Sequence, residues 1–317
     1  MGKQNPTVMI SLGGNAISPK NESGTIDEQF AHTRESLTAV MGFVQRRYNI
    51  CIAHGNGPQV GAELQRNELT QHEIPPLPLG VLVANTQGAI GYMIQQSLQN
   101  ALYKEDANRE VVSLISQVKV DKDDPELLDP KKYIGKSYNK EKADKLSQNH
   151  GWTVKEQEPN IWRRVVPSPK PLYIFNGKSI KHLVNYGTIV IAGGGGGIPA
   201  YNDKNGILHG LDGVIDKDYS AALLGRIIRA NELFMITDVD NVFLNYKQTN
   251  EKVLDKCNIS DIKKYLSEGH FGAGSMEPKM KSALYFLEHN GEKVVLTSLN
   301  KLEEALNGKA GTIITKG

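Results

Sequence analysis

Three short apolar runs in this chain each end in glycine and continue into a pattern typical of a helix. The runs cover residues 8–12, 50–53 and 189–192, and the glycines that follow them are Gly13 and Gly14, Gly55 and Gly57, and Gly193 to Gly197. An unbroken apolar run indicates a buried parallel strand, and open α/β sheets bind ligands at the carboxyl ends of such strands. Glycine there lets backbone N–H groups approach an oxyanion beside a helix N-terminus. Three such turns predict an enzyme that handles phosphate.

Charged residues that suit this chemistry stand in the second half of the chain. Lys217 lies between Asp216 and Asp218 where a helix is expected to begin, and two flanking carboxylates would keep the lysine charged and fix its direction. Lys279 follows the glycine-rich segment 272–274, with Pro278 suited to the first helical turn. Phosphoryl transfer requires mainly positioning and neutralisation of charge, which lysines and glycine turns can provide. Taken alone, each lysine could also be a solvated residue at a helix start.

Other functional classes have little support in the sequence. No glycine run is followed by the Lys-Ser or Lys-Thr of a P-loop, and Gly55, Gly57 and Gly61 do not match the G-x-G-x-x-G spacing of a dinucleotide site. The net charge of +2 does not indicate a nucleic acid or a membrane as a partner. Without an 18-residue apolar stretch or a signal-peptide pattern, and with Cys51 and Cys257 outside any C-x-x-C spacing, we expect a cytoplasmic protein with free thiols.

The elements that must position these residues alternate between strand and helix. Further strands are expected at 111–115 (as a central strand), 172–175, 233–237, 293–297 and 312–315, and helices after the capping-box pattern at 25–28, after Pro58, and at 80–103, 216–229, 260–267 and 278–289. Residues 119–170 interrupt this alternation with a stretch rich in Lys, Asp, Pro and Tyr that contains both tryptophans. The pattern predicts an α/β fold, a three-layer αβα sandwich with a lid inserted in its first half.

The same residues resemble the carbamate kinase family. The matching segments follow one another over nearly the whole chain, at 11–16, 54–61, 86–92, 194–199, 214–218 and 271–279, with 162–169 inside the insert. HGNGPQVG at 54–61 together with WRRVVPSP at 162–169 is more specific than any glycine motif alone. The resemblance implies the amino-acid-kinase fold with a mostly parallel central sheet and a protruding lid subdomain at 119–170. It divides the chain into a carbamate-binding or carbamoyl phosphate-binding half at 1–210 and a nucleotide-binding half at 211–317.

The resemblance also implies an activity and its partners. The expected reaction is the reversible conversion of ATP and carbamate to ADP and carbamoyl phosphate, run towards ATP synthesis in arginine or agmatine breakdown. Mg²⁺ would be carried by ATP or ADP, with no resident metal site, and the protein would be a homodimer. Two alternatives stay open: another amino-acid kinase that acts on a larger carboxylate, and a degenerate, non-catalytic member that binds a nucleotide or a metabolite.

Roles are implied residue by residue. Gly13, Gly14 and Asn15 would hold the phosphoryl group in transfer, and the backbone of Gly55, Asn56 and Gly57 would hold carbamate. Lys217 would neutralise the phosphoryl group, oriented by Asp218 and Asp216. The nucleotide would be bound by Thr237, Asp238, Phe243, Ser275, Met276 and Lys279.

Several positions depart from the family's pattern. In the insert, Lys132 takes the place of the family's lid lysine, but Lys131 beside it makes the register ambiguous. Before Trp162, where the family usually has Gly-Arg-Gly, this chain has Pro159, Asn160 and Ile161. Glu277 adds a carboxylate beside the expected polyphosphate, and we expect weaker nucleotide binding unless its side chain points outward.

Overall fold

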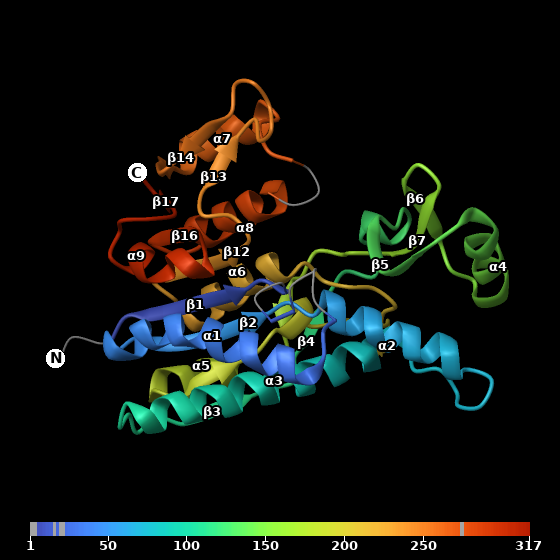
Figure 1. Cartoon of the computed structure of the whole chain (residues 1–317), viewed down its shortest axis with the longest axis horizontal. Helices are drawn as coiled ribbons and strands as arrows, with labels where there is room; N and C mark the ends of the chain where they lie inside the picture. Colours follow the sequence, from blue (N-terminus) through green and yellow to red (C-terminus); the bar gives the residue numbers. More distant parts are fainter. Residues whose placement is uncertain (1–4, 15–16, 19–22, 273–275) are drawn as a thin grey trace.

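The computed structural model of the chain describes residues 5–14, 17–18, 23–272 and 276–317. Its centre is an eight-stranded sheet in the order β15–β17–β16–β12–β1–β2–β9–β3 (Figure 1). In chain order these strands are β1 (Thr7–Leu12), β2 (Asn49–His54), β3 (Val111–Ser113), β9 (Ile189–Ile191), β12 (Glu232–Thr237), β15 (Lys256–Asn258), β16 (Lys293–Ser298) and β17 (Thr312–Thr315). Neighbouring strands are parallel except for β16 and β17, which run antiparallel. The predicted mostly parallel sheet is confirmed.

Helices cover both faces of this sheet because side chains alternate along each buried strand. Val8, Ile10 and Leu12 of β1 pack under one layer, while Met9 packs under the other. The first layer contains α1 (Ile26–Gln45), α3 (Leu79–Lys104) and α9 (Leu302–Leu306). The second contains α5 (Gly177–Tyr186), α6 (Lys217–Ile228), α7 (Ile259–Ser267) and α8 (Met276–Glu288). The fold is the predicted three-layer αβα sandwich.

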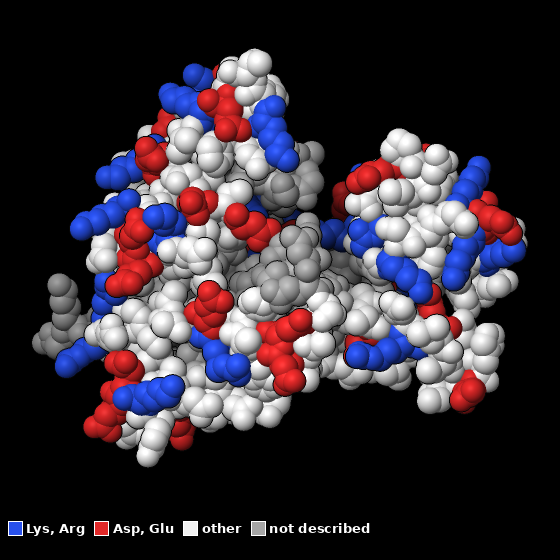
Figure 2. Space-filling view, in the orientation of Figure 1, with Lys and Arg blue, Asp and Glu red and all other residues white. Residues whose placement is uncertain are grey.

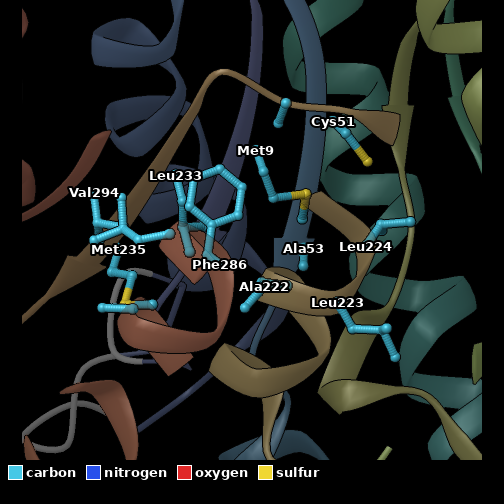
Figure 3. Close-up of a cluster of buried hydrophobic side chains, with 14 of the residues drawn as sticks. Met9, Cys51, Ala53, Ala222, Leu223, Leu224, Leu233, Met235, Phe286 and Val294 are labelled. Carbon is cyan, nitrogen blue, oxygen red and sulfur yellow. The ribbon is translucent and has the colours of Figure 1, made fainter. Parts of the chain in front are cut away.

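Packing in the second layer fixes the two helices that carry the lysines predicted for the site. Figure 3 shows Ala222, Leu223 and Leu224 of α6 and Phe286 of α8 among the buried side chains of the strands, including Met9 and Leu233. Phe286 is fully buried, and removing such a ring typically costs about 3–5 kcal/mol. Because both helices are anchored on the sheet, their first turns are held at the carboxyl edge of the strands.

Residues 119–170 contain a small subdomain that projects from the body (Figure 1). It has a three-stranded antiparallel sheet in the order β5–β7–β6, formed by β5 (Lys132–Tyr138), β6 (Val154–Glu158) and β7 (Ile161–Val166), with α4 (Lys140–His150) beside it. We call residues 119–170 the lid. Ile134 and Val166 pack against α2 (Gly57–Thr70) and α3 in a hydrophobic cluster of their own, so β5 rests on the body.

The remaining strands form two smaller sheets. One has the order β11–β10–β4–β8, with β4 (Gln117–Lys119), β8 (Tyr173–Ile174), β10 (Ile198–Asn202) and β11 (Leu208–Gly210), and the other pairs β13 (Val242–Leu244) with β14 (Lys252–Leu254). Short 3-10 turns occupy Pro125–Leu127, Gly194–Gly196 and Leu299–Lys301. No helix among the described residues is both long enough and apolar enough to cross a membrane.

One expectation about strand position was wrong. The run at 111–115 was expected to be a central strand, but β3 lies at the edge of the main sheet. Val111 is buried in the cluster that α3 covers, and Gly91 of α3 lies directly beside Ser113, but Val112 and Ser113 are only half-buried. The strand expected at 172–175 is present as β8, and it belongs to the four-stranded sheet. An apolar pattern reports burial, and burial alone does not specify which neighbour a strand pairs with.

Candidate active site

A cavity of about 410 Å³ lies at the carboxyl ends of β1, β2 and β12, beside the first turns of α2, α6 and α8. The lid covers it through Lys132, Tyr133 and Ile134 of β5. In Figure 2 the hollow between the body and the lid is visible, with lysine or arginine side chains on its lid side. The cavity brings together most of the residues predicted for the site: Gly13, Gly14, Gly55, Asn56, Gly57, Lys132, Asp216, Lys217, Asp218, Thr237, Asp238 and Lys279.

The first two glycine turns touch each other across the cavity floor. A Cβ atom on Gly55 would lie 2.8 Å from the backbone nitrogen of Gly14, so a side chain at Gly55 would force the turns apart. The N–H groups of Gly13 and Gly55 are used within the sheet, donating to the carbonyls of Ile236 and Leu12 at 3.0 Å. Among the described residues, the N–H groups of Gly14, Asn56 and Gly57 have no protein acceptor. These three N–H groups are available to a ligand.

The charged centre of the cavity is one carboxylate shared by two lysines. Lys217 Nζ lies 2.7 Å from Asp218 Oδ1, and Lys279 Nζ lies 2.6 Å from Asp218 Oδ2. Burial of Asp218 by itself would raise the pKa of its carboxyl group, but the charges of Lys217 and Lys279 lower that pKa well below its usual range. Asp218 is therefore ionised, and the cluster of two ammonium groups and one carboxylate carries a net positive charge towards the cavity.

Asp216 and Asp218 have different surroundings although they flank the same lysine. Asp216 is the N-cap of α6, and its Oδ1 atom accepts from the backbone N–H groups of Asp218 and Tyr219 at 3.0 and 3.2 Å. Its other oxygen faces the lid, where Lys132 Nζ lies 3.5 Å from Oδ2. Of the two carboxylates expected to hold Lys217, Asp218 is the one in contact with it, because Asp216 serves as the helix cap.

The two adjacent lid lysines lie on different sides of the chain. Lys132 lines the cavity, whereas Lys131 points to Asp129 and Glu126, with its Nζ atom 3.3 and 3.8 Å from their carboxylates. This placement agrees with the register that puts Lys132 over the site.

A second cavity, of about 340 Å³, adjoins the first and shares Thr237, Asp238 and Lys279 with it. Phe243 and Met276, both predicted for the nucleotide site, line this cavity. Tyr246, Gln248 and His270 also line it and were not singled out from the sequence, since they lie in a polar stretch without a recognisable spacing. Asn15 and Ser275, predicted for the phosphoryl and nucleotide sites, lie outside the described residues.

Glu277, the departure expected to weaken nucleotide binding, lines neither cavity. Its carboxylate turns along α8 and lies 2.6 Å from Lys281 Nζ, one helical turn onward. The positive charge of Lys281 thus compensates the negative charge that Glu277 adds to α8.

Two residues that the sequence did not single out, His54 and Thr86, lie beside the second glycine turn. His54, at the end of β2, is fully buried, and this burial, with a smaller contribution from Lys217, lowers its pKa to about 4. The imidazole is therefore neutral near pH 7. The side chain of Asn56 donates to Thr86 Oγ1 at 2.9 Å, and Gly195 lies so close to it that a Cβ there would be 2.3 Å from Asn56 Nδ2. The five-glycine run thus makes room for Asn56.

Comparison with known proteins decides the family. The model of the amino acid kinase family matches residues 6–298. A carbamate kinase of Pyrococcus horikoshii is 42% identical, with the alignment covering 97% of this chain and 98% of that protein, and one of Staphylococcus epidermidis is 41% identical over 98% and 99%. The chain belongs to the carbamate kinases of the amino acid kinase family. A solved carbamate kinase of Giardia lamblia, bound to AMP-PNP, superposes with a TM-score of 0.92 at 37% identity, covering 99% of each chain.

Membership in this family agrees with the arrangement of the cavities. Carbamate kinases are phosphotransferases, and the glycine turns, the shared carboxylate and the two lysines are the groups that such a reaction needs. Sequence reasoning also missed Tyr133, which lines the cavity, and Ser11, which does not line it but contacts Lys217. Ser11 had a readable signal, because it is a polar residue on the same strand face as Met9 in an otherwise apolar run.

Proposed function

We propose that this chain catalyses the reversible transfer of a phosphoryl group between ATP and carbamate, giving ADP and carbamoyl phosphate. The observation that carries the proposal is the Lys217–Asp218–Lys279 cluster, which faces the free N–H groups of Gly14 and Gly57 in one cavity. A carbamate oxygen attacks the γ-phosphorus of ATP while the bond to the β–γ bridging oxygen breaks, and ADP leaves. No side chain acts as a nucleophile, so the protein contributes positioning and charge neutralisation.

Each part of the cavity has a proposed role. Lys217 neutralises the transferring phosphoryl group, and Asp218 keeps both lysines charged and directed. Lys279, at the border of the two cavities, binds the nucleotide phosphates, while Phe243 and Met276 contact the nucleoside. Gly13 and Gly14 cradle the phosphoryl group. Gly55, Asn56 and Gly57 shape the carbamate site, with Lys132 closing over it from the lid.

We propose that Mg²⁺ reaches the site bound to the nucleotide. Among the described residues, no group of three or more His, Cys, Asp and Glu side chains is arranged to hold a metal ion, and Asp218 is already engaged by two lysines. The phosphate oxygens of ATP or ADP would therefore be its principal ligands, and the ion would neutralise part of their charge.

Each half of the chain has its own substrate in this proposal. Residues 1–210 form the half that binds carbamate or carbamoyl phosphate, including the lid region 119–170, and residues 211–317 form the half that binds the nucleotide. A homodimer is also part of the proposal, supported by exposed apolar side chains on the outer face of α3, Val81 and Tyr92. A cytoplasmic location and a role in ATP formation from arginine or agmatine breakdown stay predictions.

The deciding experiment runs the reaction in the ATP-forming direction. Purified protein is mixed with ADP, Mg²⁺ and carbamoyl phosphate, and ATP is measured with luciferase against a protein-free control. We expect ATP formation that depends on the protein and on Mg²⁺. Parallel assays with ATP and acetylglutamate or aspartate test a larger carboxylate as acceptor. A folded protein that binds nucleotide but makes no ATP would refute the proposal in favour of a non-catalytic member.

A further inference from the structure

Ser11 is a buried polar residue in an apolar setting. Ser11 lies in β1 between Ala53 of β2 and Met235 of β12, and it is fully buried. A buried hydroxyl group among apolar neighbours is costly unless it is hydrogen-bonded. The partners of its Oγ atom are the two charged residues at the start of α6, Lys217 and Asp218.

The chemistry of these partners fixes the direction of both hydrogen bonds. An ammonium group can only donate and an ionised carboxylate can only accept. Lys217 Nζ therefore donates to Ser11 Oγ at 3.0 Å, and Ser11 Oγ donates to Asp218 Oδ1 at 2.8 Å. With the 2.7 Å contact between Lys217 and Asp218, the three groups form a closed ring. The Ser11 hydroxyl group thus accepts one hydrogen bond and donates one.

The ring joins two elements that must keep their relative position. Asp218 is the neighbour of Lys217 in α6, so their contact does not by itself place the lysine relative to the sheet. Ser11 stands on β1, two residues before Gly13, where the first glycine turn begins. Among the described residues, its hydrogen bond is what connects the Lys217 ammonium group to that strand.

We infer that Ser11 is a positioning residue, which holds the ammonium group of Lys217 in register with the Gly13–Gly14 turn. The inference rests on the proposed function, because it concerns the same phosphoryl-transfer site. Ser11 does not line the cavity and acts through Lys217. Its loss should therefore affect the chemical step more than the binding of either substrate.

The same hydrogen bond also favours the charged form of Lys217. Burial lowers the pKa of this lysine, and the charge of Lys279 lowers it further, while Asp218 opposes both. The other charged or titratable groups around it are Asp216 on α6, His54 on β2 and Lys132 on the lid. Removing the acceptor at Ser11 leaves the ammonium group less stabilised, so its pKa should fall further. If catalysis needs a charged Lys217, a variant without the Ser11 hydroxyl group should lose activity at a lower pH than the wild type as the pH is raised.

The test compares Ser11→Ala with a matched control, Ser282→Ala. Ser282 is another fully buried serine, whose Oγ atom bonds to the Pro278 carbonyl within α8. From the loss of one hydrogen bond to a charged group, Ser11→Ala should lower kcat about fivefold or more. We expect the KM values for ADP and carbamoyl phosphate to stay within about twofold, and the alkaline limb of the kcat profile to move to lower pH. Ser282→Ala should leave kcat and its pH profile unchanged, and Ser11→Thr, which keeps a hydroxyl group, should recover part of the loss.

A second readout does not depend on catalysis. Competitive acetylation of Lys217 with acetic anhydride, followed by mass spectrometry across pH, should show labelling that begins at lower pH in Ser11→Ala than in the wild type. Thermal unfolding of each variant separates loss of function from loss of fold. An unchanged kcat profile and unchanged labelling in folded Ser11→Ala would overturn the inference. An inactive wild type whose Lys217 labelling still shifts with Ser11→Ala would refute the proposed function while leaving the positioning role in place.

Discussion

Lys132 in the lid and Asp216 at the start of α6 face each other at 3.5 Å, between Nζ and Oδ2. This ion pair joins the lid directly to the helix that carries Lys217. Asp216 makes both contacts because its two oxygens have different partners: Oδ1 caps α6, and Oδ2 faces Lys132. We expect an anionic substrate in the cavity to compete with Asp216 for Lys132.

The first prediction concerns the paired lysines of the lid. Lys132→Ala should depress turnover and weaken carbamoyl phosphate binding, more at low salt than at high salt, because exposed charges are screened by ions. Lys131→Ala is the matched control and should stay within a few-fold of the wild type, since Lys131 points to Asp129 and Glu126. Steady-state kinetics at two ionic strengths measures both effects. Greater sensitivity at Lys131 would show that it, and not Lys132, serves the reaction.

Lys217 should be the most sensitive side chain of the site. A preorganised cation at the developing phosphoryl charge is worth about 3–4 kcal/mol, so Lys217→Ala should lower kcat by roughly two to three orders of magnitude. Circular dichroism should show an intact fold, because the lysine lies at a helix start and contributes little to the core. Near-normal turnover in this variant would mean that the residue has only a structural role.

Asp218 should matter for stability as well as for catalysis. Asp218→Asn removes the charge that compensates two largely buried lysines, and breaking a buried pair in this way costs about 3–5 kcal/mol. Urea unfolding should show a lower free energy of unfolding, and turnover should fall with it. Adding Lys279→Met to this variant removes one of the uncompensated charges, so stability should partly recover while activity does not. An Asp218→Asn variant as stable as the wild type would contradict the shared-carboxylate account.

Much of this site could be predicted because parallel strands end at one edge of their sheet. Once 8–12 and 50–53 are read as neighbouring buried strands, the glycines after them must lie close together, and a helix start after each strand follows from the α/β alternation. Lys217 and Lys279 are placed by the same logic, each at a helix start whose apolar residues pack on the sheet.

What the sequence left open depends on contacts between distant segments. Asp216 and Asp218 are equivalent in sequence around Lys217, and only the residue at which α6 begins makes one the cap and the other the partner of two lysines. Ser11 lies 206 positions from Lys217, so no spacing pattern links them. The edge position of β3 likewise depends on which strand β9 pairs with, which the composition of either strand does not encode.

Glu277 should be harmless to nucleotide binding only while Lys281 is present. Lys281→Ala removes its partner at 2.6 Å and leaves an uncompensated carboxylate in the first turn of α8, near the nucleotide cavity. The KM for ADP should rise a few-fold without a change in kcat, and the double variant Glu277→Gln/Lys281→Ala should restore it. Stability should change little, because exposed pairs one helical turn apart contribute only about 0.3–0.5 kcal/mol. Equal ADP affinity in all three proteins would show that Glu277 exerts no field on the nucleotide.

The last prediction concerns His54, which burial keeps neutral in the folded protein. Its folded-state pKa is lowered to about 4 from an ordinary value of 6.5, so between these values the unfolded chain binds a proton that the folded protein does not. The free energy of unfolding is therefore unaffected by this group above pH 6.5 and decreases as the pH falls towards 4, by up to about 1.4 kcal/mol per pH unit. His54→Asn keeps a donor for the Gly55 carbonyl but cannot titrate. Urea unfolding at a series of pH values from 7 to 5 should give a shallower decline for this variant than for the wild type. Identical slopes would mean that His54 is protonated in the folded protein at the same pH as in the unfolded chain, so that neither its burial nor the Lys217 charge disfavours the imidazolium.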